Sequence, residues 1–158
     1  MNMKEQIKIM RAIEAANKRH LEDWKKAQEA QKPMVTGILI DVHTGTASVA
    51  TIEKGLDGYH KALRCDCIDI TWRSIGGRRF CIICDDEGLL KSDCRLSAID
   101  SSGTPQLVGN LFVVQDDGEE DVRSLTPEEA VHVMQHTQKI IDLRHKEAFM
   151  ILTDCNYC

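Results

Sequence analysis

The residues of this chain whose type and spacing could do chemistry are its seven cysteines. Two CxxC pairs, Cys81 with Cys84 and Cys155 with Cys158, could together supply the four thiolates of a structural zinc site. A zinc-binding pair normally lies on a tight turn, whereas FCIIC at 80–84 is a continuous apolar run typical of a strand. In a strand, positions i and i+3 point to opposite faces, so the two sulfurs would diverge. We therefore expect buried thiols, no metal and no cofactor, with a zinc-stabilised structural module as an alternative.

The sequence contains no constellation typical of a catalytic site. A redox CxxC needs a helix that begins directly after it, and none is expected after Cys84. His132 and His136 are spaced i and i+4, which could place both on one metal, but the HExxH signature is absent. Because there is also no triad, no paired carboxylates with an evident cleft and no cofactor fingerprint, we expect that the protein is not an enzyme.

Arginines beside a double glycine are the first candidates for binding a small anion. In Gly76-Gly77-Arg78-Arg79 the glycines can expose backbone donors, and the two guanidinium groups can bind a phosphate. The alternative is a hairpin turn with solvated arginines. Arg95 is the third candidate, after the acidic turn 85–88, which lacks the ligand spacing of a calcium-binding EF-hand loop.

A long N-terminal helix is predicted from Met3 to about Gln31, because this segment is rich in Ala, Lys, Glu and Gln and contains no Gly or Pro. Asn2 is placed to cap it, and Pro33 marks its end. Ile9 and Ile13 belong to one apolar stripe, with a second stripe beside it. At about 40 Å the helix is longer than a compact domain of this size, so we expect it to contact a partner subunit.

The middle of the chain is predicted to be an antiparallel sheet of about five strands. Alternating or β-branched runs predict strands at 35–41, 47–53, 67–74, 79–85 and 109–114, with a short helix or turn at 56–63. Gly45 can supply the positive φ of a hairpin between the first two. The other turns are predicted at the double glycine, at the acidic turn and at Ser101-Ser102-Gly103.

A C-terminal helix is predicted to start at Thr126-Pro127-Glu128-Glu129, which combines a capping box with proline at the first helical position. Apolar residues at three-to-four spacing extend this prediction to about Lys146 or beyond. The fold class is therefore α+β, with a central antiparallel sheet between a long N-terminal and a C-terminal helix. We divide this single domain into a helix for oligomerisation or docking (1–32), a sheet core (33–125), and a C-terminal helix with a cysteine-rich tail (126–158).

Five segments follow one another in an order that resembles a family of short uncharacterised domains carried by bacteriophages, plasmids and other mobile elements. They are GYHKAL (58–63), CDDEGLLK (84–91), CR (94–95), VGNLFVV (108–114) and RSLTPEE (123–129). The family shows an N-E-E-G-K-L turn, an N-R pair, a G-T-F-V strand and an S-L-T-x-E-E helix start. Cys84 or Asp85 replaces the first Asn, Cys94 the second, and Asn110 the Thr. The resemblance implies that Glu87 and Arg95 are the polar members retained from any family pocket.

Charge and composition set limits on the function. The net charge of −5 and the 28% of charged residues argue against nucleic acid as a partner. No apolar run approaches the roughly 20 residues of a membrane span, and the N-terminus is amphipathic rather than a signal peptide, so we expect a cytoplasmic protein without a membrane partner.

From the residues we expect a non-enzymatic, homo-oligomeric binding protein. The resemblance implies that it belongs to a phage or mobile element, a setting in which small proteins often counter host defence. It would bind or sequester a host defence protein or a small anionic nucleotide signal, for which Arg78, Arg79, Glu87 and Arg95 are the candidate ligand-binding residues. The alternative to this function is an adaptor or inhibitor that docks on another protein through its N-terminal helix.

Overall fold

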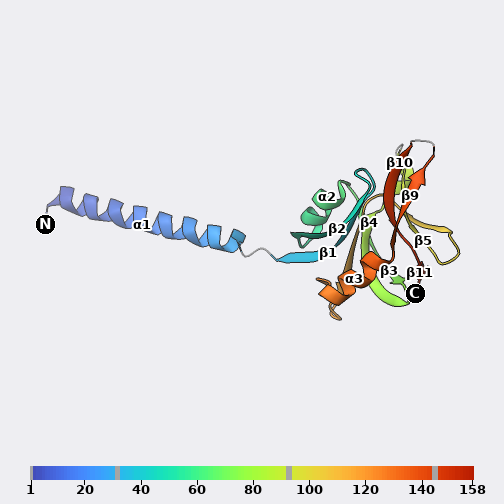
Figure 1. The fold of residues 1–158 in the computed structure, drawn as a ribbon. Helices are drawn as coiled ribbons and strands as arrows, with labels where there is room; N and C mark the ends of the chain where they lie inside the picture. The colour runs from blue at the N-terminus through green and yellow to red at the C-terminus, as the bar shows by residue number, and fades with distance from the viewer. Residues whose placement is uncertain (1, 31–32, 92–93, 144–145) are drawn as a thin grey trace. The chain divides into compact units, whose positions relative to one another are not determined.

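The chain divides into two units, Met1–Pro33 and Met34–Cys158. The computed structural model describes residues 2–30, 33–91, 94–143 and 146–158 of these units. The first unit is one helix, and the second contains two sheets and two shorter α-helices (Figure 1). The predicted α+β class, with a helix near each end and an antiparallel sheet between them, is confirmed.

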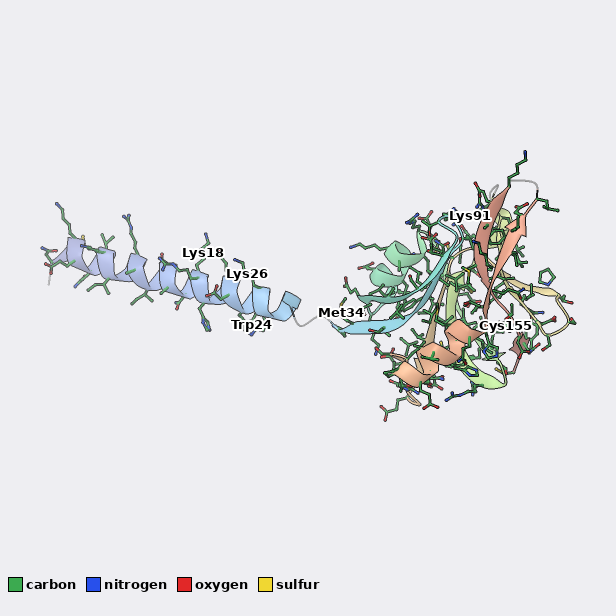
Figure 2. The ribbon with its side chains drawn as sticks, viewed as in Figure 1. Lys18, Trp24, Lys26, Met34, Lys91 and Cys155 are labelled. Atoms are coloured by element: carbon green, nitrogen blue, oxygen red, sulfur yellow. The ribbon has the colours of Figure 1, made fainter. Side chains whose placement is uncertain are left out.

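The first unit consists of helix α1 (Met3–Ala30), and its predicted cap is present. The Asn2 side-chain oxygen accepts a hydrogen bond from the backbone N–H of Glu5 at 2.9 Å. The described side chains of α1 are exposed, including the apolar Ile13, Leu21 and Trp24. Figure 2 shows side chains projecting from the helix. The last residues of the predicted helical segment, 31–32, lie outside the described residues. Among the residues described, no helix combines the length and apolarity needed to cross a membrane.

The larger sheet has seven strands, and all of its pairings are antiparallel. Its order is β11-β3-β4-β7-β1-β2, with β8 also paired to β7. Its strands are β1 (Met34–Asp41), β2 (Thr46–Glu53), β3 (Ile68–Ile75), β4 (Arg78–Asp85), β7 (Leu111–Asp116), β8 (Val122–Arg123) and β11 (Cys155–Tyr157). The five predicted strands correspond to β1, β2, β3, β4 and β7. Gly45 has a φ of 72° in the β1–β2 loop, as predicted.

A second sheet of four strands has the order β6-β5-β10-β9. Its strands are β5 (Leu96–Ile99), β6 (Pro105–Val108), β9 (Thr137–Asp142) and β10 (Glu147–Leu152). The single bridge between β10 and β5, at Leu152 and Ala98, is parallel, and the other pairings are antiparallel.

The predicted extent of the C-terminal helix is wrong. Helix α3 (Pro127–Gln135) begins where predicted but ends at Gln135, and β9, β10 and β11 follow it. Within β10, Phe149 and Ile151 are buried because they alternate towards the core. The apolar spacing in this region fits both a helix and a strand, so periodicity alone could not distinguish them. Residues 144–145 of this region lie outside the described residues.

The larger sheet has an apolar cluster on each face. One cluster contains Phe80, Ile82 and Cys84 of β4 together with residues of α3, β5, β10 and β11. The opposite cluster contains Cys81 and Ile83 of β4 together with helix α2 (Leu56–Leu63). Strand β4 is therefore buried on both faces, with α2 on one side and with α3 and the smaller sheet on the other (Figure 1).

Helix α3 is fixed to the larger sheet through Glu129. The predicted capping box is present: Glu129 N–H donates to Thr126 Oγ1 at 3.2 Å, and Thr126 N–H donates to the Glu129 carboxylate at 2.9 Å. Arg123 and Gln115 also donate to this carboxylate. Because these donors favour the charged form, above all the Arg123 guanidinium, the pKa of Glu129 falls to about 2.

The low pKa of Glu129 predicts acid sensitivity. Its contribution to stability is complete above its ordinary pKa of 4.5 and is lost as the pH falls towards about 2. Between pH 6 and pH 3 the free energy of unfolding should fall by on the order of 2 kcal/mol more in the wild type than in Glu129→Gln. Urea denaturation of both proteins at several pH values measures this difference. An equal fall in both would contradict the assigned role of the carboxylate.

Candidate functional site

Polar residues gather where the central strands of the larger sheet end. β7 runs antiparallel to both β1 and β4, and Leu111 at its start lies opposite Ile40 and Cys84. The residues just beyond these positions, Asp41, Asp85 and Asn110, are therefore brought to the same edge, and all three are buried. We call this region, together with the cations that contact it, the sheet-end cluster.

Three cations lie at the sheet-end cluster, each beside a carboxylate: Arg64, Lys91 and, as described below, Arg95. Arg64 is 3.5 Å from Asp41, and Lys91 is 2.5 Å from Asp85. The Asp85 carboxylate, which accepts a hydrogen bond from Lys91, raises the pKa of that ammonium group. The carboxylates are buried, whereas the side chains of Arg64 and Lys91 are 59% and 40% exposed. The Arg64 and Lys91 side chains are therefore partly accessible to solvent and can contact an anion.

Asn110 connects three elements inside the sheet-end cluster. Its side-chain oxygen accepts a hydrogen bond from Val42 N–H at 2.9 Å, and its amide nitrogen donates to the Leu63 carbonyl at 3.1 Å. The end of β1, the end of α2 and the start of β7 are thus held together by one buried amide. The amide carries its acceptor and its donor on separate atoms, so each atom can reach a different partner.

Two glycines allow the loops of this region to approach closely. Gly109 has a φ of 80°, and its N–H donates to the Arg95 carbonyl at 2.8 Å. A Cβ on Gly88 would lie 3.0 Å from the Val108 carbonyl oxygen. The acidic turn, the segment at Arg95 and the segment at Asn110, which are distant in sequence, are therefore neighbours in the fold.

Arg95 lines a polar hollow of about 270 Å³ at the sheet-end cluster. The lining residues are His43, Thr44, Gly45, Arg95, Glu147 and Ala148. The Arg95 guanidinium is 2.6 Å from the Glu147 carboxylate and 3.4 Å from the Val42 carbonyl. It is mostly buried, whereas Glu147 is half-exposed. A small polar ligand with an anionic group could enter this hollow and replace the Glu147 carboxylate at the guanidinium.

The other predicted site residues are divided between the two ends of β4. Glu87 follows β4 at the sheet-end cluster and is exposed. Arg78 and Arg79 begin the strand, which places them about 20 Å away from its other end. Arg78 is 4.0 Å from the Glu128 carboxylate, and Arg79 lies over the Trp72 ring at 4.5 Å. The four candidates therefore do not form one pocket.

Cys81 and Cys84 adopt the predicted arrangement, whereas Cys67, Cys94 and Cys158 are exposed and not buried as expected. Cys81 and Cys84 lie in one continuous strand and belong to the clusters on opposite faces of the sheet. Burial raises the pKa of each of these two thiols to about 12 and that of Cys155 to about 11. Within the described ranges, no three His, Cys, Asp or Glu side chains are grouped closely enough to hold a metal ion.

His132 and His136 are packed against the backbone. His132 Nε2 is hydrogen-bonded to the Ile75 carbonyl at 2.7 Å, and His136 Nδ1 to the His132 carbonyl at 2.8 Å. The His136 ring also fills the space where a Cβ of Gly76 would lie. These contacts fix α3 against the β3–β4 turn and give the pair a structural role.

Residues 35–139 match a family model described as a domain of unknown function, DUF3846. The chain belongs to this family. No curated protein and no solved structure matches it. The DUF3846 region begins in β1, after α1, and ends within β9. It includes each residue of the sheet-end cluster named above except Glu147 and Ala148.

Several residues of the cluster in this DUF3846 domain were not predicted as site residues. Asp41, Arg64 and Lys91 stand in the sequence without a motif, and only the strand pairing brings them together. Asn110 was noticed only as a replacement for a threonine. The sequence signal that could have identified them is a polar residue at the end of an apolar strand run, as at Asp41 and Asp85.

Removal of the Asn110 amide should destabilise the domain. Asn110→Ala leaves the Val42 N–H and the Leu63 carbonyl buried without their partner, so we expect a loss of about 2 to 4 kcal/mol in the free energy of unfolding. Gln138→Ala deletes an exposed amide and should change it by no more than about 0.5 kcal/mol. Chemical denaturation compares the two. Similar values for both variants would show that the Asn110 bonds are not what holds this edge.

Proposed function

We propose that this DUF3846 chain is a non-enzymatic binding protein of a bacteriophage or other mobile element. It acts in the cytoplasm, where it counters host defence by sequestering a small nucleotide signal at the sheet-end cluster. The observation that carries the proposal is the position of Arg95: this residue, selected from the sequence as a ligand-binding candidate, lines a polar hollow. Two further cations, Arg64 and Lys91, contact the carboxylates Asp41 and Asp85 at the ends of β1 and β4. The mobile-element setting rests on the resemblance of the ordered segments between 58 and 129.

Binding would proceed by exchange of anions at Arg95. In the absence of ligand, the half-exposed Glu147 carboxylate is paired with the Arg95 guanidinium. A phosphate group brings more charge and more acceptor oxygens than one carboxylate, and a guanidinium binds it in a bidentate manner. Lys91 and Arg64, each partly exposed, would attract the remaining negative charge of the ligand.

The protonation of the buried thiols supports binding without catalysis. With a pKa of about 11 or 12, Cys81, Cys84 and Cys155 are thiols near neutral pH, and a thiol is a poor nucleophile. Burial also raises the pKa of Cys65, which lies beside the sheet-end cluster, to about 11. Sequestration needs cations and a hollow that admits the ligand, and it does not need a reactive group.

A thermal-shift assay of the purified chain tests the proposed ligand class. Micromolar concentrations of cyclic and ADP-ribose-derived nucleotides should include at least one that raises the melting temperature, by about 2 to 6 °C at saturation. Arg95→Gln should abolish that shift, because the phosphate loses its guanidinium. Glu147→Gln should lower the ligand's Kd, because the competing carboxylate is removed.

Arg78→Gln is the matched control, since it removes an exposed guanidinium from the opposite end of β4. It should leave the shift unchanged. If Arg78→Gln abolishes the rise in melting temperature and Arg95→Gln retains it, the ligand binds at the β3–β4 turn. The absence of any shift across a broad nucleotide panel would contradict sequestration of a nucleotide.

Helix α1 favours a second function, in which the chain docks on a host protein as an adaptor or inhibitor. Apolar residues of α1 are exposed within its own unit, in the spacing of a helix that lies in a partner's groove. Residues 1–33 contain eight basic and five acidic residues, whereas the rest of the chain contains 12 and 20. The partner of this segment should therefore present an apolar groove with an acidic rim.

Deletion of residues 1–32 should abolish capture of that partner by tagged protein. Leu21→Asp in the full chain should weaken capture by at least about tenfold, because a charge enters the apolar face. Lys8→Gln, on the polar face, is the control and should retain most of the binding. If the deleted protein still captures the same partner, α1 is not the docking element.

A further inference from the structure

Strand β2 is an edge strand of the larger sheet that is open to pairing. It has eight residues and is paired with β1 along its whole length, from Met34–Glu53 to Asp41–Thr46, without a bulge. Its sequence, TASVATIE, contains no Lys, Arg or Pro, and its one charge is Glu53 at the end. An edge strand presents unpaired N–H and C=O groups, and a long, regular, uncharged edge is a template for another strand.

The other edge strands of the described sheets carry features that oppose such pairing. β11 has three residues, and β8, which pairs with β7 off the main strand order, has two. β6 has four, begins with Pro105 and is paired to β5 with register shifts. β9 carries Lys139 near its middle and Asp142 at its end. Short length, proline, bulges and lysine are the usual protections of an edge, so their absence from β2 distinguishes this strand from the other four.

An apolar groove adjoins β2 on the face of the larger sheet that carries α3. The groove has a volume of about 600 Å³ and lies between α3 and the β1–β2 hairpin. Its lining residues are Thr36, Gly37, Val49, Leu125, Thr126, Pro127, Ala130, Val131, Met134 and Gln135. Val49 and Val131 are 62% and 56% exposed. The open backbone edge and the open apolar surface are therefore contiguous.

We propose that β2 pairs antiparallel with β2 of a second copy of this chain, so that the two larger sheets join across a two-fold axis. Antiparallel pairing of a strand with itself is self-complementary, as an isologous interface requires. An axis perpendicular to the sheet places both grooves on the same face. The two α3 helices then face each other across the axis, and Val49 and Val131 of both copies become buried.

The extent of the surface also indicates that the groove takes part. The edge of an eight-residue strand is about 27 Å long and about 10 Å thick. Its area is therefore roughly a third of the ~800 Å² per subunit that a stable dimer buries. The groove walls beside β2 supply the additional apolar surface. A foreign extended peptide would pair with the edge but leave the groove largely uncovered, whereas a second copy covers both.

Charge is compatible with self-pairing at β2. The seven residues from Thr46 to Ile52 carry no charge, so no like charges meet when the strand faces its own copy. Glu53 is at the end of the strand, away from an axis near Val49. This interface lies wholly within residues 34–158 and differs from the oligomerisation through the N-terminal helix that the sequence suggested.

The oligomeric state of the full chain tests this inference. Size-exclusion chromatography with light scattering and native mass spectrometry at about 50 µM should give a dimer. Val49→Lys places a charge at the axis in both subunits and should raise the dimer Kd at least about tenfold. Val131→Lys, on α3 across the groove, should also raise it. Ile141→Lys is the matched control, because Ile141 is a 68% exposed apolar residue on the β9 edge.

Thermal melts followed by circular dichroism show whether each variant is folded. Because the two substitutions lie on different elements, the test still holds if one of the variants does not fold. A monomeric wild type, or a dimer that persists in both folded Val49→Lys and Val131→Lys, would overturn the interface. Equal weakening by Ile141→Lys would show general apolar association instead. If deletion of residues 1–32 dissociates the dimer and Val49→Lys leaves it intact, the contact between the subunits is made by α1.

Discussion

The burial of β4 on both faces is the constraint on which the rest of the second unit depends. One face of this strand contacts the α2 layer, and the other contacts α3 and the smaller sheet. Side chains of a strand alternate between faces, so β4 must be apolar at consecutive positions. This explains the run FCIIC and the separation of its two sulfurs by the thickness of the sheet.

Where a core is closed on both sides, the strand ends are places at which polar groups can be buried together with partners. Asp41, Asp85 and Asn110 occupy such ends and are satisfied by backbone groups or by cations that reach in from loops. The same arrangement creates the hollow at Arg95, since the loops that carry these groups cannot pack as closely as strands do. The candidate site is thus a consequence of how the sheet terminates.

Local signals in the sequence predicted the parts of the fold that local chemistry decides. Asn2, the capping box at Thr126 and Glu129, the hairpin at Gly45 and the five central strands are examples. The region after Gln135 was mispredicted, because Ile140, Ile141 and Ile151 fit a helix as well as strands. The pairing of β9 with β10, and of β10 with the distant β5, decided between them. For the same reason Arg95 could be selected from the sequence, whereas Asp41, Arg64 and Lys91 became its neighbours only through strand register.

The two thiols of β4 are natural reporters on the layers of the protein. Cys81 faces the α2 layer and Cys84 faces the layer of α3 and the smaller sheet, and both are shielded from solvent. An alkylating reagent reaches either sulfur only when the layer above it opens. Residue-resolved labelling rates for these two positions would therefore reveal whether the layers separate together or one before the other, without any engineered probe.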